Sequence, residues 1–525
     1  MNKPIFYRDV VRFEQSQRGE YQDLSYEPTF RASAIFFVIL DDKTNTHVSF
    51  MNYWREKNNN PFVSALVTVR DGDGCKIHRE FEILEDFVYQ FDLKNLVAQK
   101  VEYPFIGSVE FELFSIQDLK YSFPALNVFY EAPDGVSFVH SNQRVFNNIQ
   151  DNDRSSSLSG WQTGFDIYAD NEYSGYLTLI NGPRPVDSDQ LDLQVFNRDG
   201  QVKEERIDLG NLKAYSTKFI NIEEEIPNLK SFLNSQAGFC KVLFDSFGVF
   251  QRIACGNFSK DRSRFSVTHS YYDCNDHNDY IESSHVDNEE YKCFLPFGLV
   301  ENLELDLVFY PIYAPSNLLF SLDCFSPTTG NLEATVDNFA SFQSIGTKHL
   351  RFNIRKILQE HKLPTSEDRL YCLHINTIDG RIPSRLTFGM NYSKEGIGCN
   401  INSSMLLSSS YGLRRRLYLW GPLIYRESGR NNILLAHLSK QKELKEEAEI
   451  HLKILARREV VSSVTYHTVN GSFVNINAEN IIAQSGYTPN HNEILWYVLE
   501  SKCPNYVCNQ IYISESGFVG GDHSF

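Results

Sequence analysis

The sequence lacks the short motifs by which many enzymes are identified. It contains no Gly-x-x-x-x-Gly-Lys-Ser/Thr loop for phosphates, no His-Glu-x-x-His pair for zinc and no Gly-x-Ser-x-Gly nucleophile turn. Catalytic residues that lie far apart in sequence would escape such a search. The residues point to no known family, so function has to be argued from the architecture.

The sequence also lacks a hydrophobic run that could cross a membrane. The longest apolar run, residues 34–40, ends at Asp41 and Asp42, whereas a membrane helix needs about 20 apolar residues. The first 24 residues are interrupted by charged side chains and have no apolar core. We therefore expect no secretory signal, no membrane insertion and a cytoplasmic location.

Cysteine pairs of the Cys-x-x-Cys type are missing although the chain has ten cysteines. In a reducing compartment these are expected to be free thiols. Cys503 and Cys508 flank a probable turn, where a disulfide or half of a metal site is an alternative to two free thiols.

Positive charge is scarce. The 50 Lys and Arg residues are outnumbered by 67 Asp and Glu residues, which gives a formal net charge of −17. Since phosphate backbones attract basic proteins, nucleic-acid binding is disfavoured. Hydrophobic residues make up 42% of the 525 residues and aromatic residues 14%, which is enough to build packed cores in several domains.

What the sequence does contain is a repeated short strand that ends in His-Ser. It occurs at residues 137–141, 265–270 and 520–524, and a fourth copy at 399–403 has asparagine in place of histidine. The spacings between His140, His269, Asn402 and His523 are 129, 133 and 121 residues. A second anchor keeps nearly the same spacing, as tandem duplication predicts. It is an Asp or Asn in a polar corner that can start a turn or short helix, at Asp92, Asn221, Asn353 and Asn475.

These anchors and the period-two alternation between them predict an all-β fold. We expect four tandem Ig-like antiparallel β-sandwich domains, at residues 1–150, 151–287, 288–409 and 410–525. Residues 444–454 test this expectation, because their Glu, Lys, Leu and Ala content favours a helix. The repeat register predicts a strand there, with Ile450, Leu452 and Ile454 on one face.

The repeated histidines are the first candidate site. A strand-end histidine most often packs on its sandwich and bonds a loop carbonyl. The functional alternative is that His140, His269 and His523 contact a ligand or metal. Each histidine would then serve its own domain, or the histidines would converge on one shared site. Five aromatic side chains could stack on a sugar ring or a partner surface, namely Tyr271, Tyr272, Trp54, Trp161 and Trp420. In a chain this rich in Phe and Tyr, however, most aromatics are expected to lie in cores or domain interfaces.

The second candidate is a dense group of metal-binding residue types between residues 269 and 287. His269, Asp273, Asp276 and His277 could hold a divalent metal ion. The spacing matches no known finger or calcium loop, and a solvated acidic linker is the simpler interpretation.

Three hypotheses on function follow. The first is a non-enzymatic binding or scaffold protein that presents its repeated modules to a protein or glycan partner and needs no cofactor. The second is a metal-dependent or carbohydrate-active enzyme with its site near residues 269–285. The third is a self-assembling structural protein, since sandwich edges can pair between chains.

Overall fold

The chain folds into antiparallel β-sheets that pair into β-sandwich-like units, with 58% strand and 7% helix. The structure is a computed structural model that describes residues 30–120, 123–140, 143–145, 161–244, 248–250, 252–272, 280–282, 291–310, 317–342, 350–383, 386–407, 416–426, 428–442 and 444–525. All three predicted domain boundaries fall outside the described residues, so they stay predictions. No helix in the described ranges has the length and apolar character to cross a membrane.

Unit one comprises the described residues up to 145. Its first sheet has the order β1 (Phe30–Leu40), β6 (Phe105–Ser115), β3 (Val63–Asp71), β4 (Lys76–Ile83). The second sheet has the order β5 (Val88–Asp92), β2 (Asn45–Met51), β7 (Asn127–Ala132), β8 (Gly135–His140). Two short helices, α2 (Tyr53–Glu56) and α3 (Leu93–Leu96), follow β2 and β5.

Unit two covers residues 161–272. Its first sheet has the order β14 (Val202–Leu212), β13 (Val186–Phe196), β16 (Gly238–Phe244), β10 (Gln162–Thr163), β20 (Tyr271–Tyr272), with β11 (Asp166–Ile167) also on β16. The second has the order β15 (Thr217–Asn221), β12 (Tyr173–Ile180), β18 (Ala254–Ser259), β19 (Phe265–His269). The helices are α4 (Ile222–Glu225) and α5 (Leu229–Leu233), and β17 (Val249–Phe250) pairs with β9 (Arg144–Val145).

Unit three extends from residue 280 to 407. Its first sheet has the order β25 (Leu332–Phe342), β24 (Leu318–Phe325), β27 (Tyr371–Thr377), β22 (Cys293–Phe297), β31 (Leu406–Leu407). The second has the order β26 (Leu350–Asn353), β23 (Glu304–Phe309), β29 (Thr387–Ser393), β30 (Cys399–Ser404). The helix is α6 (Ile354–Glu360), and β21 (Tyr280–Glu282) pairs with β28 (Arg381–Pro383).

Unit four runs from residue 416 to 525. Its first sheet has the order β32 (Leu417–Ile424), β37 (Ile494–Ser501), β34 (Glu447–Leu455), β35 (Val460–Val469). The second has the order β36 (Ser472–Asn477), β33 (Arg430–His437), β38 (Tyr506–Ile513), β39 (Val519–His523), and the helix is α7 (Ala478–Ser485). The second sheets of all four units thus have the same strand order, and each has its last strand at one edge.

The polar corners behave as helix starts in all four units, with one correction. The side chains of Asp92, Asn221 and Asn353 each accept a hydrogen bond from a backbone amide of the helix that follows. In unit four the cap is Asn477 and not Asn475. Asn475 instead lies within β36 and accepts a hydrogen bond from the Asn432 side chain at 2.7 Å. The sequence prediction was wrong by two residues because Asn occurs at both positions on the same face of the strand.

The ambiguous segment at residues 444–454 is a strand, as the repeat register predicts. It forms β34, in which Ile450, Leu452 and Ile454 are buried. His451 and Lys453, which alternate with them, lie on the other face, so the alternation that buries three side chains outweighs helix propensity.

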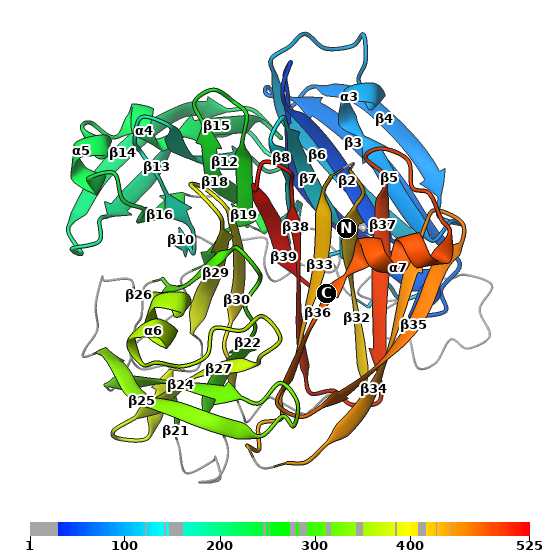
Figure 1. The fold of residues 1–525 in the computed structure, drawn as a ribbon. Coiled ribbons are helices and arrows are strands. Elements are labelled where there is room, and N and C mark those ends of the chain that lie inside the picture. Colours follow the sequence, from blue (N-terminus) through cyan, green and yellow to red (C-terminus); the bar gives the residue numbers. More distant parts are fainter. Residues whose placement is uncertain are drawn as a thin grey trace, which may run out of the picture.

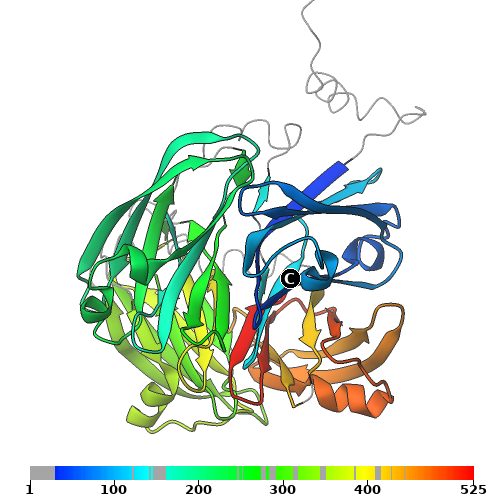
Figure 2. The same cartoon turned by 90° about the horizontal axis from the view of Figure 1, so that it is seen from above.

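The last strands of the four second sheets meet at one axis. Strand β8 contacts β19 and β39, and β30 contacts the same two strands, so the four units close into a ring. Figure 1 shows these four strands near the centre of the molecule, and Figure 2 shows the C-terminal end of the chain beside unit one. The chain therefore returns to its own first unit, and four equivalent strand ends approach one another.

Each neighbouring pair of strands at the axis has a specific contact. Ser137 Oγ donates to Phe265 O at 2.6 Å between β8 and β19. Thr268 Oγ1 donates to Asn400 O at 2.9 Å between β19 and β30. A side chain at Gly521 in β39 would approach Cys399 Sγ of β30. The seam between β39 and β8 is formed by Asp522 and by the close approach of Gly520.

Substitution of Gly520 tests ring closure. A Cβ atom at this position would lie 2.2 Å from the backbone oxygen of Val136, so Gly520→Ala must push β39 away from β8. We expect the free energy of unfolding, measured in urea by tryptophan fluorescence, to fall by about 1–3 kcal/mol. Gly72→Ala is the control, because its Cβ would make an ordinary contact of 3.4 Å. Equal unfolding midpoints for both variants would contradict the described seam.

Candidate metal centre

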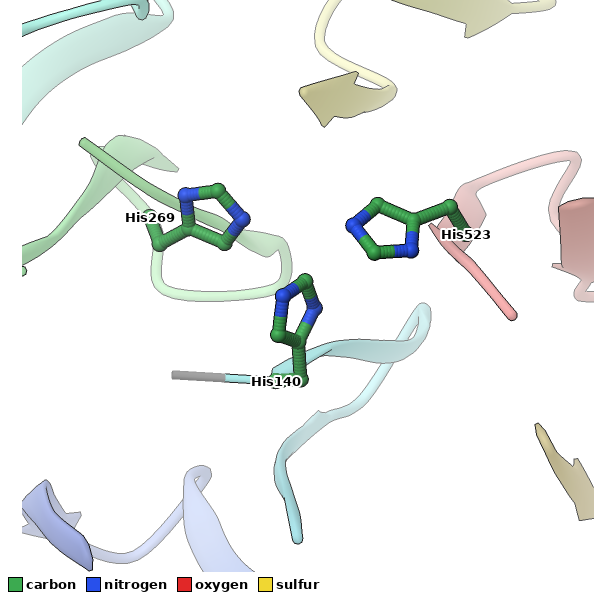
Figure 3. Close-up of side chains that lie close together, drawn as sticks. All are labelled: His140, His269 and His523. Atoms are coloured by element: carbon green, nitrogen blue, oxygen red, sulfur yellow. The ribbon is translucent and has the colours of Figure 1, made fainter. Parts of the chain in front are cut away.

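Three of the repeated histidines converge at the axis of the ring. His140 ends β8, His269 ends β19 and His523 ends β39, so three different units contribute one imidazole each. One ring nitrogen of each lies within 4.8 Å of the other two. Figure 3 shows the three rings facing a common space. The ring centroid of His140 lies 4.7 Å from that of His269 and 4.4 Å from that of His523.

The Nδ1 atoms of the three rings are held by groups around the cluster. Nδ1 of His269 lies 3.0 Å from Ser270 O, and Nδ1 of His523 lies 2.9 Å from Ser524 O. Nδ1 of His140 lies 2.8 Å from Oδ2 of Asp522. A carbonyl or carboxylate acceptor places the proton on Nδ1 and leaves the lone pair on Nε2, which is the arrangement of metal-binding histidines.

Burial keeps two of these imidazoles neutral. It holds the pKa of His269 well below its usual value, and the neighbouring Arg252 guanidinium acts in the same direction. Burial and the nearby His140 lower the pKa of His523 to about 4, although Asp522 acts in the opposite direction. Neutral imidazole is the form that binds a metal. Nε2 of His269 is buried and has no hydrogen-bond partner among the described residues.

Arg252 is the positive group nearest to the cluster. Its Nε donates to Ser270 O at 3.2 Å and lies 3.3 Å from Nδ1 of His269. We assign Ser270 O as the acceptor shared by Arg252 and His269. It lies 3.0 Å from His269 Nδ1 and 3.2 Å from Arg252 Nε, whereas the two nitrogen atoms lie 3.3 Å apart. Asp522 carries the opposing negative charge. Burial raises the pKa of its carboxyl, but the electrostatic attraction of His140 and the hydrogen bonds from His140 outweigh burial and bring the pKa below its ordinary value.

The fourth strand end carries Asn402, whose side chain forms hydrogen bonds with the backbone of unit two. Its Nδ2 donates to the backbone oxygen of His269 at 2.7 Å, and also to Gly164 O. Its Oδ1 is buried without a hydrogen-bond partner among the described residues. Asn402 therefore fastens β30 to β19 in the position where the other units supply an imidazole.

The donor set fits zinc or a related divalent ion. Three imidazoles with an open fourth position form a known zinc ligand set. Tetrahedral bonds of about 2.0–2.1 Å place nitrogen atoms about 3.4 Å apart. The ring nitrogens lie within 4.8 Å of one another, so each pair would have to approach by no more than about 1.4 Å. Asp522 contacts Nδ1 of His140. A carboxylate in this position commonly orients a histidine that binds a metal.

Of the other candidate residues from the sequence, the structure places Tyr271 beside this cluster. Asp273, Asp276 and His277 lie outside the described residues, and so does the side chain of Tyr272. Tyr271 packs edge-on against His269, with ring centroids 5.2 Å apart, and it is buried. Trp54 and Trp420 are buried as well. These three side chains fill the cores and the seams between units, as is expected of most aromatics in a chain this rich in Phe and Tyr.

A small polar cavity between units two and three, of about 60 Å³, is a weaker candidate site. Asp166 lies in its wall and binds Arg351, which also contacts Asp306 at 2.8 Å. Tyr310 donates to Asp166 at 3.1 Å. Since Arg351 already pairs with both carboxylates and the cavity has room for little more than water, the cavity belongs to the seam between the two units.

Sequence reasoning missed Asp522 and Arg252. Asp522 stands next to His523 in the sequence, so a carboxylate beside a repeated histidine was the available signal. No comparable signal marked Arg252, because it reaches the cluster only through the β17–β18 region of the fold.

Comparisons with known proteins add no identity. No family model and no curated protein matches the chain. Solved structures of Bacteroides uniformis beta-glucuronidase align weakly. A calcium-binding mutant of beta-glucuronidase 2 has 10% identity over 48% of this chain and 27% of that chain, with a TM-score of 0.11. The complex of that enzyme with cyclophellitol-6-carboxylate aziridine has 10% identity, 47% and 26% coverage and the same TM-score. The alignment spans about a quarter of those chains, and scores this low carry no argument.

Proposed function

We propose that this chain is a non-enzymatic scaffold or binding protein built from four copies of one Ig-like β-sandwich module. The shared strand order of the four second sheets supports this proposal, as do the helix-capping corners that recur at equivalent places. We place the module boundaries near residues 150, 287 and 409. The ring arrangement gives such a protein a rigid frame, because each unit is held by two neighbours.

A divalent transition-metal ion, zinc by ligand type, is the proposed clamp at the centre of this frame. The observation that carries it is the convergence of His140, His269 and His523 from three units, with their Nδ1 atoms already held by acceptors. An ion bound there would join the first, second and last units. Binding to the folded state alone would stabilise the fold by about 2.7 kcal/mol at a metal concentration of 100 times Kd.

The outer surface is the proposed place for a protein or glycan partner or for a second copy of the chain. Strands β4, β14, β25 and β35 form the outer edge of the first sheet in their units. Exposed apolar side chains recur on these strands, at Phe81, Ile83, Val202, Leu332 and Val460. Exposed edges and apolar side chains favour contact with another chain. We place the protein in the cytoplasm.

Metal analysis of the purified chain tests the clamp. Mass spectrometry of the metal content is expected to show bound zinc, and His269→Ala should remove one equivalent per chain. His277→Ala is the first control, because the alternative site at His269, Asp273, Asp276 and His277 would lose its metal in both variants. His467→Ala is the second control, since that side chain is 76% exposed.

A chelator should lower the midpoint of thermal unfolding by more in the wild-type chain than in His269→Ala. The proposal fails if the wild-type protein binds no zinc and added zinc leaves its unfolding midpoint where it was. A loss of metal in His277→Ala as well as His269→Ala would move the site to the segment that follows β19.

A further inference from the structure

A second group of metal-binding side chains lies within unit four. His437 ends β33, Cys503 lies in the loop between β37 and β38, and Glu446 directly precedes β34. Sγ of Cys503 lies 3.4 Å from Nε2 of His437, and Oε2 of Glu446 lies 3.7 Å from the same nitrogen. One ligand atom of each lies within 4.8 Å of the other two. Three segments distant in sequence therefore bring sulfur, nitrogen and oxygen ligands together.

The separations fit a tetrahedral ion with little movement. Bonds of about 2.3 Å to sulfur and about 2.0–2.2 Å to nitrogen and oxygen place ligand atoms roughly 3.4–3.6 Å apart. The two measured separations from His437 Nε2 lie within a few tenths of an ångström of these values. The side chains of His437 and Cys503 are nearly buried, whereas that of Glu446 is 28% exposed, so an ion could enter from the side of the carboxylate.

The surrounding residues orient the side chains of His437 and Glu446. Nδ1 of His437 lies 3.0 Å from Thr468 Oγ1, which lies 2.5 Å from the Tyr506 hydroxyl. The Tyr506 ring also stacks on the imidazole, with centroids 4.3 Å apart. Asn505 donates to Glu446 Oε2 at 2.8 Å. A hydroxyl acceptor at Nδ1 leaves the lone pair on Nε2, directed towards the thiol and the carboxylate.

Burial disfavours charge on both the thiol and the imidazole of this cluster. It raises the pKa of the Cys503 thiol, and it lowers the pKa of His437 although Glu446 acts in the opposite direction. Cys503 and Cys508 are free thiols, so no disulfide occupies this position.

We propose that Cys503, His437 and Glu446 bind one divalent transition-metal ion, zinc by ligand type, separately from the three-histidine cluster. The thiol loses its proton to solvent when the ion binds, so the sulfur binds as thiolate. A water molecule completes the four ligands. The ion fixes the β37–β38 loop to the segment before β34, beside Leu438, which packs against the core of unit three.

Cobalt titration of the metal-free chain tests this site without interference from the other cluster. Cobalt(II) bound to a thiolate has a sulfur-to-metal charge-transfer absorption in the near ultraviolet, which a site of three imidazoles cannot produce. In His269→Ala, where the other cluster cannot compete for cobalt, we expect this band to saturate at one equivalent per chain, and it should disappear in Cys503→Ser. Cys75→Ser is the matched control, since Cys75 is an exposed free thiol, and its band should equal that of the wild type.

Glu446→Gln provides a variant that keeps the fold, because its amide oxygen can still accept from Asn505. It should weaken cobalt binding at least tenfold while the circular dichroism spectrum stays that of the wild type. The inference is overturned if the wild-type chain shows no charge-transfer band, or if Cys75→Ser removes the band and Cys503→Ser does not. His269→Ala must leave the band intact, and a loss there would mean that the two sites are not independent.

Discussion

Asp522→Asn is expected to lower the free energy of unfolding of the metal-free chain by about 1–3 kcal/mol, because a buried carboxylate that accepts three hydrogen bonds is replaced by an amide with one acceptor oxygen. Oδ2 of Asp522 accepts from the backbone N–H of His140 at 2.6 Å and contacts its ring at 2.8 Å. Oδ1 accepts from the backbone N–H of His523 at 2.8 Å. An amide group would present N–H to at least one of these donors, in a carboxylate site that is only 2% exposed.

The same substitution should weaken metal binding at the three-histidine cluster by about 10–100-fold, as loss of an orienting carboxylate commonly does. Urea unfolding in chelator gives the first quantity and competition with a chromogenic zinc chelator gives the second. Asp118→Asn is the control, since that carboxylate is 52% exposed and contacts Lys120, by an ion pair at 3.8 Å and a hydrogen bond from the backbone N–H at 2.8 Å. It should change stability by no more than about 0.5 kcal/mol.

The two measurements separate two roles of Asp522. A fall in stability with unchanged zinc affinity would show that the carboxylate serves only the seam between β39 and β8. Unchanged stability would contradict the buried contact itself. A fall in both is the result expected if the seam and the metal centre share this residue.

The equivalence of the strand ends could be predicted from the sequence, but their convergence could not. The spacings of His140, His269, Asn402 and His523 show that these residues occupy the same place in each module. Whether such places meet depends on how modules pack. Packing is decided by seam contacts such as Trp496 Nε1 donating to Ser49 Oγ at 2.9 Å, across 447 residues of sequence.

The site in unit four illustrates a different limit. His437 and Cys503 are 66 residues apart, and neither belongs to a spaced motif. The turn after Cys503 suggested Cys508 as its partner, yet the extended strand β38 carries Cys508 away from Cys503. In the strand prediction for residues 444–454, by contrast, alternation within one segment was sufficient, because burial of one face is a local property.

Asp323 forms the most buried charged contact between units three and four. Its side chain is fully buried in β24 and accepts from Tyr291 Oη and Thr335 Oγ1, both at 2.6 Å. Lys442 of unit four approaches it at 3.3 Å, and His374 lies at 3.5 Å. Burial raises the pKa of Asp323, but His374 and the hydroxyl donors outweigh burial and hold the pKa well below its ordinary value.

Asp323→Asn is therefore expected to lower the free energy of unfolding at pH 7 by about 3–5 kcal/mol, since Lys442 loses its buried counter-charge. The difference should shrink in acid. The folded chain keeps Asp323 ionised at pH values where the unfolded chain, with a pKa of about 3.9, has taken up a proton. The contribution of this carboxylate is thus fully present above about pH 4 and is lost as the pH falls further.

Urea unfolding at pH 7 and at several values below pH 4 measures both effects. Asp379→Asn is the matched control in the same unit, because that carboxylate is 35% exposed and pairs with Arg381 on the surface. An unfolding free energy that falls equally at all pH values would mean that shape, and not charge, explains the loss. Equal stability of Asp323→Asn and the wild type at pH 7 would show that the seam between units three and four does not depend on this ion pair, and that apolar packing such as Phe473 against Gly298 holds it alone.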